Sequence, residues 1–222
     1  MDVTTATVIS PMSDKNKTTY QIEAVSPAGG VFYRIVKRAF DVLVSLVVGI
    51  VAIPFLLIIA LLIRIDSPGR AIYIQERIGK NGKPFRMLKF RTMVEDAEQG
   101  VPVWADTEDP RCTRLGKKLR ECRIDELPQL WNIFVGDMSV VGPRPERQCF
   151  YDEFEEYIHG FRNRLVVKPG LTGLAQVNGG YDLLPEEKIV YDMEYIEHRN
   201  LWLDIKIMIK TIRVICKKEG VK

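Results

Sequence analysis

The longest apolar stretch of the chain runs from Val42 to Ile63, where 22 successive residues carry no charge. A straight helix of that length would extend roughly 33 Å at about 1.5 Å per residue, enough to cross a hydrocarbon layer of ~30 Å. Pro54 stands inside the stretch, where a proline removes a helix hydrogen bond and forces a kink. The pattern therefore predicts a kinked, membrane-inserted helix.

Basic residues flank this stretch on both sides, with Arg34, Lys37 and Arg38 before it and Arg64, Arg70 and Arg77 after it. Because positive charge prefers the cytoplasmic side of a membrane, both ends are satisfied if both stay in the cytoplasm. Residues 31–66 are then a re-entrant helical hairpin that dips into one leaflet and returns. An ordinary single span with a tolerated proline stays open as the alternative.

The segments on either side of the membrane helix differ in character. Residues 1–30 are rich in Thr, Ser, Asp, Lys and Pro, with no sustained period, and we expect a mobile polar tail there rather than a signal peptide. Residues 67–222 are expected to form a compact cytoplasmic domain.

Alternating and helical patterns predict a mixed α/β domain that is mainly helical. Residues 71–77 and 85–93 are β-rich runs joined by a turn that contains Asn-Gly, which predicts a small hairpin. The remaining pattern predicts helices over 115–134, 147–161, 185–198 and 201–218, a Pro-bracketed loop over 139–146, and a short strand with turns over 166–178.

The last of these helices carries a basic stripe. Lys206, Lys210, Arg213 and Lys217 recur at spacings of four, three and four, so they share one face, and apolar residues cover the rest. This combination is typical of an amphipathic helix that lies on an anionic membrane surface. A core helix with one solvated side remains the alternative.

Composition narrows the possible functions. The 32 Lys and Arg exceed the 29 Asp and Glu by only three, too balanced for a protein that coats nucleic acid, and we expect no nucleic-acid partner. The four cysteines form no CxxC pair, which argues against a zinc finger or a disulfide scaffold. We interpret His159, His198 and the cysteines as structural.

One acidic pair, Asp125 and Glu126, is the first candidate for chemistry. If the segment is one helix, Asp125 shares a face with Gln129 and Asn132, and Arg120 lies just upstream. A carboxylate beside cations and Mg²⁺ can act as a nucleophile toward phosphorus. An acidic first turn of a helix, which is common, is the alternative.

Two further groups carry cations. Pro143 and Pro145 fix the backbone on either side of Arg144, whose guanidinium could clamp a diphosphate, although a stiff surface turn would look the same. Lys89 and Arg91 share a strand face and could meet an anionic ligand or simply water.

Together these features favour an enzyme that moves a phosphorylated group from a soluble anionic donor to a lipid phosphate at the cytoplasmic membrane face. A non-enzymatic membrane-surface adaptor that binds anionic lipid is the alternative from another class. A single-span protein with a soluble ligand-binding domain is a third.

A series of ordered motifs resembles the bacterial sugar transferases, or monotopic phosphoglycosyl transferases, from about Phe32 to Lys218. The motifs are KRAFD at 37–41, QERIG at 75–79, KFRTM at 89–93, DPR at 109–111, DELPQL at 125–130, GPRPE at 142–146 and KPGLTG at 168–173. With no large membrane domain before them, the chain is similar to the small catalytic-core form of the undecaprenyl-phosphate sugar phosphotransferases.

The resemblance implies an activity and a location. The family transfers a sugar 1-phosphate from a nucleoside-diphosphate sugar, usually a UDP-sugar, to polyprenyl phosphate and releases UMP, with Mg²⁺ as cofactor. This is the first membrane step of exopolysaccharide, capsule, O-antigen or glycan assembly, at the cytoplasmic face of the bacterial inner membrane. Its anchor is a re-entrant helix broken at a proline, which Pro54 matches, and Ile53 stands where members often have Ser.

The resemblance also implies residue roles. Asp125 would be the nucleophile that forms a covalent phosphosugar intermediate, and it would also be a metal ligand. Glu126 would assist it through metal or proton handling, and Arg144 would hold the donor diphosphate. Further substrate-binding positions would be Lys89, Arg120 and Asp192.

Overall fold

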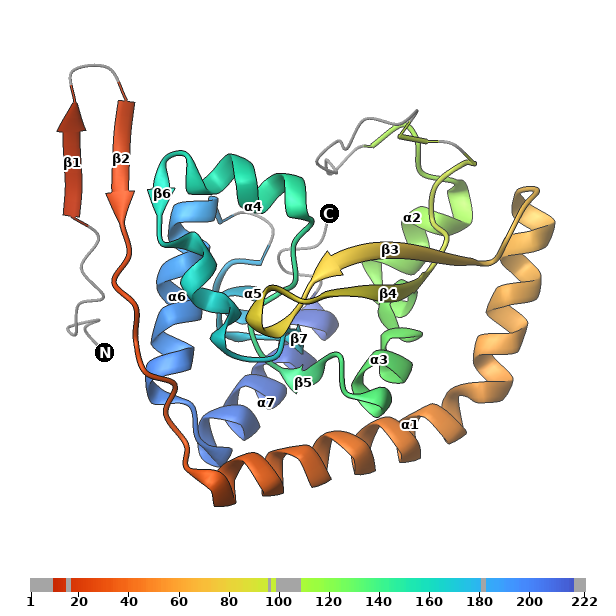
Figure 1. The fold of residues 1–222 in the computed structure, drawn as a ribbon. Coiled ribbons are helices and arrows are strands. Elements are labelled where there is room, and N and C mark those ends of the chain that lie inside the picture. Colours follow the sequence, from red (N-terminus) through yellow and green to blue (C-terminus); the bar gives the residue numbers. More distant parts are fainter. Residues whose placement is uncertain (1–9, 15–16, 96, 99–108, 181–182, 218–222) are drawn as a thin grey trace.

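The longest element of the structure is one apolar helix at its edge. The computed structural model describes residues 10–14, 17–95, 97–98, 109–180 and 183–217. The 36-residue helix α1 (Val31–Asp66) borders the molecule and changes direction along its length (Figure 1). Pro54 lies inside α1, where its missing N–H favours a bend, as the sequence predicts. By length and composition α1 could cross a membrane, and only 11% of its most apolar 18-residue window is buried.

The other helices lie on one side of α1 in this view (Figure 1). They are α2 (Arg114–Glu121), α3 (Gln129–Val135), α4 (Gln148–Glu155), α5 (Leu174–Asn178), α6 (Pro185–His198) and α7 (Leu201–Lys217), with 3-10 turns at Lys80–Gly82, Ile124–Glu126 and Phe161–Val166.

The strands of the described residues form three small sheets. The strands are β1 (Ser10–Asp14), β2 (Lys17–Gln21), β3 (Ile72–Ile78), β4 (Pro84–Phe90), β5 (Ser139–Val141), β6 (Ile158–His159) and β7 (Gly170–Thr172). β2 pairs with β1 and β6, β3 with β4 in antiparallel register, and β5 with β7 in parallel. The sheet with β1 and β2 lies at the outer edge of the molecule (Figure 1). The described chain is thus the mixed, mainly helical α/β fold that the sequence predicts.

A buried aspartate joins α1 to the two C-terminal helices. Asp204, near the start of α7, accepts hydrogen bonds from Tyr33 Oη at 3.0 Å and Lys37 Nζ at 2.9 Å. Its other oxygen accepts a hydrogen bond from Tyr195 Oη of α6 at 2.9 Å. Because three donors converge on one buried carboxylate, the first turn of α1 is held at a defined angle to the domain.

The next turn of α1 makes a second polar connection. Arg38 donates to the backbone carbonyls of Ile133 and Phe134, both at 2.7 Å, at the C-terminal end of α3. Asp41 is buried and accepts a hydrogen bond from Ser139 Oγ at 3.1 Å at the start of β5. Arg38 satisfies carbonyls that the end of α3 leaves unpaired, and the two contacts together fix α1 against the domain core.

The far half of α1 packs on the same domain through apolar side chains. Ile59 and Ile63 are buried in a small cluster with Phe90 of β4 and Leu119 of α2. The larger core lies beyond it and includes the fully buried Ile133, Met138, Ile158, Ile189, Met193 and Ile196. Both halves of α1 therefore contact one body of protein.

The expectation of an unstructured tail over residues 1–30 is wrong for its second half. β2 pairs with β6 through Tyr20 and Gln21, and Ile22 is buried in the main core. Residues 10–14 form β1, while residues 1–9 and 15–16 lie outside the described residues. The polar composition of the segment gave no sign of this order, because the contacts that hold it are with residues far away in the chain, such as the hydrogen bond from Ala28 N to Ile196 O.

The prediction of one helix over 115–134 is also wrong. α2 ends at Glu121, and Arg123 adopts a left-handed backbone with φ of 54°. A 3-10 turn follows, and Pro128, which cannot donate a helix hydrogen bond, stands directly before α3 at Gln129. The carboxylates therefore sit on a turn between two short helices and not on a continuous helical face.

The other expected elements are confirmed or shortened. β3 and β4 form the predicted hairpin, whose Asn81 and Gly82 both have positive φ, as Asn-Gly turns require. α6 and α7 match the predicted helices within one residue. The helix expected over 147–161 ends at Glu155 and is followed by β6, and the expected loop at 139–146 begins with β5.

Substituting Asp204 by alanine should destabilise the fold strongly. The change leaves the donors of Tyr33, Lys37 and Tyr195 without their buried acceptor, and breaking such a group costs about 3–5 kcal/mol. Thermal unfolding in detergent should show a clear fall in Tm, whereas Asp66→Ala, at an exposed position of α1, should leave Tm unchanged. Equal Tm values for the two variants would contradict this account of the junction.

Candidate active site

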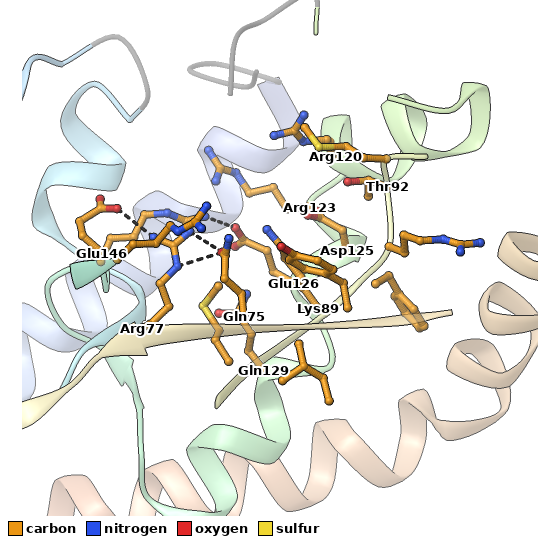
Figure 2. Close-up of a pocket in the computed structure, with 18 of the residues that line it drawn as sticks. Gln75, Arg77, Lys89, Thr92, Arg120, Arg123, Asp125, Glu126, Gln129 and Glu146 are labelled. Atoms are coloured by element: carbon orange, nitrogen blue, oxygen red, sulfur yellow. Dashed lines mark hydrogen bonds and ion pairs between the residues drawn. The ribbon is translucent and has the colours of Figure 1, made fainter. Parts of the chain in front are cut away.

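A cavity of about 850 Å³ opens between the β3–β4 hairpin, the turn that joins α2 to α3, the loop after β5, and α6. Its lining carries eleven Arg and Lys side chains against six Asp and Glu side chains. Figure 2 shows Asp125 and Glu126 near its middle, with Arg77 and Glu146 on one side and Arg120 on the other. An enclosed surface with so many cations attracts a polyanionic ligand.

The chain reversal between α2 and α3 brings the two carboxylates into this cavity. Thr113 caps the N-terminus of α2, since its side-chain oxygen accepts a hydrogen bond from the Gly116 amide at 2.9 Å. The 3-10 turn Ile124–Glu126 then carries Asp125 and Glu126, which are 9% and 7% exposed. Burial of two adjacent carboxylates is costly unless each is stabilised by cations or hydrogen bonds.

Glu126 has a dedicated partner. Arg144 Nη2 donates to Glu126 Oε1 at 2.5 Å, from the loop that follows β5. Burial alone would raise the pKa of Glu126, but attraction to Arg144, and then to Arg123 and Lys89, outweighs it and holds the pKa below its ordinary value. Glu126 is therefore ionised at neutral pH and orients the Arg144 guanidinium.

Asp125 has no such partner. Among the described residues, its side chain makes no hydrogen bond or ion pair, and its oxygens are not among the sealed polar atoms of the structure. Burial, and then repulsion from Glu126, raise its pKa to about 7, against the opposing attraction of Lys89 and Arg120. A carboxylate with a raised pKa and open access to a cationic cavity is a stronger nucleophile than a solvated aspartate.

The nearby cations come from separate elements. Burial, and then repulsion from Arg77, lower the pKa of Lys89 of β4 to about 8, although Asp125 opposes the shift. The Lys89 ammonium lies 5.1 Å from the centroid of the Tyr73 ring, its partner across the hairpin. Arg120 of α2 donates from Nη1 to Cys112 Sγ at 3.0 Å. Lys89 and Arg120 thus lie on two different sides of Asp125 and both attract its carboxylate (Figure 2).

The structure gathers the residues that the sequence singles out. The cavity lining contains all of Lys89, Arg120, Asp125, Glu126, Arg144 and Asp192. Pro54 lies on α1, outside the lining. Arg91, which shares a strand pattern with Lys89, donates to the carbonyls of Ser67 and Pro68 and so holds the segment after α1. The catalytic and binding roles of the six lining residues stay predictions.

Four residues of the lining received no site role from the sequence: Gln75, Arg77, Glu146 and Arg164. Arg77 of β3 forms an ion pair with Glu146 at 3.0 Å, and it donates to Gln75 Oε1 from Nε and Nη2. The QERIG run at 75–79, which contains Gln75 and Arg77, and the glutamate of the GPRPE motif, Glu146, are the signals that could have found the first three. Arg164, in the 3-10 turn Phe161–Val166, forms a buried ion pair with Asp192 at 2.6 Å. No pattern in the sequence distinguishes Arg164 from a surface arginine.

Within the described part of the chain, no three His, Cys, Asp or Glu side chains gather closely enough to hold a metal ion by themselves. The described cysteines are all free thiols. A divalent cation here would have to share its coordination between Asp125 and oxygen atoms of a ligand, which is the usual arrangement of Mg²⁺ at phosphate sites.

Comparison with known proteins points to one family. Residues 32–218 match a family described as bacterial sugar transferase. The chain is 42% identical over 193 residues to a UDP-N-acetylgalactosamine-undecaprenyl-phosphate N-acetylgalactosaminephosphotransferase of Aeromonas hydrophila, covering 86% of this chain and 46% of the relative. It is 40% identical over 192 residues to a UDP-glucose:undecaprenyl-phosphate glucose-1-phosphate transferase of Escherichia coli (strain K12), covering 84% and 41%.

Another relative is close to this chain in length. The exopolysaccharide production protein ExoY of Sinorhizobium fredii (strain NBRC 101917 / NGR234) is 37% identical over 212 residues, covering 89% of this chain and 91% of the relative. The chain thus spans less than half of the first two relatives and nearly all of the third.

Removing the Arg144 guanidinium should destabilise the fold in a pH-dependent way. Arg144→Ala leaves Glu126 buried without its partner, and we expect a loss of about 2 kcal/mol at pH 7.5, less than for a fully buried pair because the Arg144 side chain is 28% exposed. Because the folded-state pKa of Glu126 is lowered, the pair stabilises the fold above the unfolded-state pKa of about 4.3. That stabilisation is lost as the pH falls through the folded-state pKa.

Thermal unfolding of both proteins at pH 7.5 and at pH 3.5 measures this effect. The difference in Tm between wild type and Arg144→Ala should be large at pH 7.5 and should shrink at pH 3.5. Arg86→Ala, at an exposed position of β4, is the matched control and should be neutral at both pH values. A difference independent of pH would contradict the pairing.

Proposed function

Because the chain belongs to the bacterial sugar transferase family, we propose that it transfers a sugar 1-phosphate from a UDP-sugar to a polyprenyl phosphate such as undecaprenyl phosphate. The names of its relatives supply the donor and acceptor classes. The observation that carries the proposal for this chain is Asp125, an unpaired carboxylate with a raised pKa inside a cationic cavity. The product would begin the membrane stage of exopolysaccharide, capsule, O-antigen or glycan assembly.

The reaction takes two displacements at one phosphorus atom. An Asp125 carboxylate oxygen attacks the phosphorus that carries the sugar, the bond from that phosphorus to the bridging oxygen breaks, and UMP leaves with the electron pair. A phosphate oxygen of the polyprenyl phosphate then attacks the same phosphorus, and the bond to Asp125 breaks to restore the carboxylate. The expected kinetics are ping-pong.

The cations of the cavity make these encounters between anions feasible. Lys89, Arg120 and Arg144 offset the charge of the donor diphosphate and of the transferring group. Glu126 holds Arg144 in register and remains ionised, because its pKa is lowered. The three cationic groups are in place before substrate binds, so little reorganisation of the protein is needed at the moment of transfer.

Mg²⁺ is the cofactor that fits this site. The open carboxylate of Asp125 can contribute one protein ligand, and Glu126 can support it, while donor phosphate oxygens and water complete the coordination. A bound ion would supply charge neutralisation on the transferring phosphoryl group.

The form of α1 supports a re-entrant anchor over a single span. Tyr33 at its start and Ile63 near its end both contact the same domain, through Asp204 and Phe90 respectively. A helix that crossed ~30 Å of hydrocarbon would carry its two ends to opposite sides, away from a common body. With basic residues at both ends, we place the domain at the cytoplasmic face of the bacterial inner membrane.

The last helix, α7, is proposed to lie on the membrane surface. Trp202, Ile205 and Ile209 are exposed on it, although their side chains are large and apolar. Lys206 and Lys210 are exposed among them, and Lys206 lies 5.6 Å from the centroid of the Trp202 ring. Exposed apolar and basic side chains on one helix are typical of contact with anionic lipid.

Asp125→Asn should abolish turnover, because the amide cannot attack phosphorus. In wild type, incubation with UDP-sugar and Mg²⁺ but no acceptor should release UMP and add the mass of one phosphosugar to Asp125, as measured by intact-protein and peptide mass spectrometry. Chelation of Mg²⁺ should prevent both. The matched control Asp152→Asn, at an exposed position of α4, should behave like wild type.

Normal activity of Asp125→Asn, or product formation without any adduct, would refute the covalent mechanism. Absence of UMP release from every UDP-sugar tested with undecaprenyl phosphate would favour the alternative, a non-enzymatic adaptor that binds anionic lipid.

Cysteine labelling tests the membrane geometry. In a background without native cysteines, Ser26→Cys and Lys83→Cys introduce thiols at exposed positions before and after α1. A re-entrant anchor predicts that an impermeant maleimide reaches both thiols only after the inner membrane is permeabilised, with the cysteine-free protein as control. Labelling of one thiol in intact spheroplasts and the other only after permeabilisation would establish a single span.

A further inference from the structure

We propose that Arg164, with Asp192 as its counter-ion, is a positioning residue that holds Arg144 in place through the backbone carbonyl of Arg144. Arg164 Nη2 donates to that carbonyl at 2.8 Å. The inference rests on the proposed function, in which Arg144 holds the donor diphosphate, and it gives Asp192 a supporting role in place of contact with substrate.

The loop that carries Arg144 is held by its carbonyl groups. Two of its residues are prolines without an N–H, and the segment after β5 forms no regular element that could restrain it. Four successive carbonyls each accept a hydrogen bond from a different donor: Pro143 O from Gly170 N at 2.9 Å, Arg144 O from Arg164 Nη2 at 2.8 Å, Pro145 O from Arg77 Nη1 at 3.1 Å and Glu146 O from Ile78 N at 3.0 Å.

Arg164, the donor to the Arg144 carbonyl, is more deeply buried than Arg77, the other side-chain donor to this loop. Arg164 is 3% exposed, and its guanidinium lies 2.6 Å from Asp192 Oδ2 and 5.1 Å from the centroid of the Phe161 ring. Asp192 is 1% exposed and is carried by α6, whose neighbouring Met193 is fully buried in the core. The guanidinium therefore rests on a rigid base of helix and core.

Stability alone does not account for a charged pair at this place. Arg164 Nε and Nη1 are buried without an acceptor among the described residues, and Asp192 Oδ2 meets Arg164 as an ion pair without hydrogen-bond alignment. Buried polar atoms without partners destabilise a fold, and apolar side chains of similar volume often replace such pairs without loss. The contact that an apolar side chain could not supply is the hydrogen bond to the Arg144 carbonyl.

Direct contact with substrate does not account for the pair either. The Arg164 and Asp192 side chains belong to the cavity lining but are only 2% and 1% exposed, so almost none of their surface is open to a ligand. Arg144, by contrast, is 28% exposed at its side chain and meets Glu126 at the centre of the cavity. Arg164 therefore acts through Arg144, since displacing a substrate-holding group by about 1 Å can cost up to a hundredfold in rate.

A double-mutant cycle tests this coupling. Arg164→Met, Arg144→Ala and the double variant are compared with wild type for kcat and KM with UDP-glucose or UDP-N-acetylgalactosamine and undecaprenyl phosphate. The fraction of protein that forms the Asp125 adduct counts the active molecules. We expect Arg164→Met to lower kcat/KM about 10- to 100-fold, mainly through the donor KM. In the Arg144→Ala background the same change should cost less than about threefold.

Two further variants sharpen the result. Arg162→Met, two residues away at an ion pair with Asp152 on the surface, is the matched control and should stay within about twofold of wild type. Arg164→Lys retains a cation opposite Asp192 and one donor for the Arg144 carbonyl, so it should recover part of the loss. Should Arg164→Met not fold, Arg164→Lys and Asp192→Asn carry the same cycle with smaller effects.

Three results would overturn the proposal. Losses that multiply in the double variant would make Arg164 independent of Arg144. An unchanged donor KM with a smaller active fraction would make it merely structural. Equal activity of the Lys and Met variants would remove the role of the donated hydrogen bond.

Failure of the proposed function would look different from these results. In that case wild type itself would form no adduct and release no UMP. Calorimetric binding of UDP needs no turnover and still tests the positioning role, because Arg164→Met should bind UDP about tenfold more weakly than wild type and Arg162→Met should not. Equal UDP affinity of all three proteins would overturn the proposal whatever the reaction is.

Discussion

The site depends on keeping two neighbouring carboxylates buried side by side. Such an arrangement is unfavourable in isolation, because both groups lose water and repel each other. The two carboxylates differ in their surroundings. Arg144 pairs with Glu126 and keeps it ionised, while Asp125 is left unpaired with a raised pKa. One residue is a fixed counter-ion and the other is left unpaired in the cavity, although both belong to the same turn.

The same constraint explains why the surrounding cations come from distant segments. Lys89 belongs to β4, Arg120 to α2 and Arg144 to the loop after β5, so no single element could deliver the charge. β4 also connects the site to the anchor, because Arg91 at its end donates to the carbonyls of Ser67 and Pro68 directly after α1. The segment that follows the proposed membrane helix and the strand that carries Lys89 are therefore joined by direct hydrogen bonds.

Local chemistry made much of the fold and of the site predictable. Asn81 and Gly82 specify the turn of the hairpin, and Pro185 with two acids specifies the start of α6. The order of the motifs around Lys89, Asp125 and Arg144 predicted a common site, and all of them line one cavity. The prediction of one helix over 115–134 was wrong because a break of one turn leaves the spacing of apolar residues almost unchanged. The left-handed backbone of Arg123 that ends α2 cannot be recognised from residue types. The prediction missed β2 for a different reason: the strand is held by pairing with β6, which lies far away in the chain.

The sequence by itself determined the elements whose causes are local: the apolar helix with its proline, the hairpin, the terminal helices, and the acidic pair Asp125-Glu126 with arginines close to it in the chain. Only the tertiary structure decided which cation pairs with which carboxylate, that Asp192 is buried against Arg164, and that both ends of α1 rest on one domain. Those outcomes depend on distance and burial between segments separated by tens of residues. A carboxylate's charge state follows from its desolvation and its neighbours in space, and neither is written in the residues beside it.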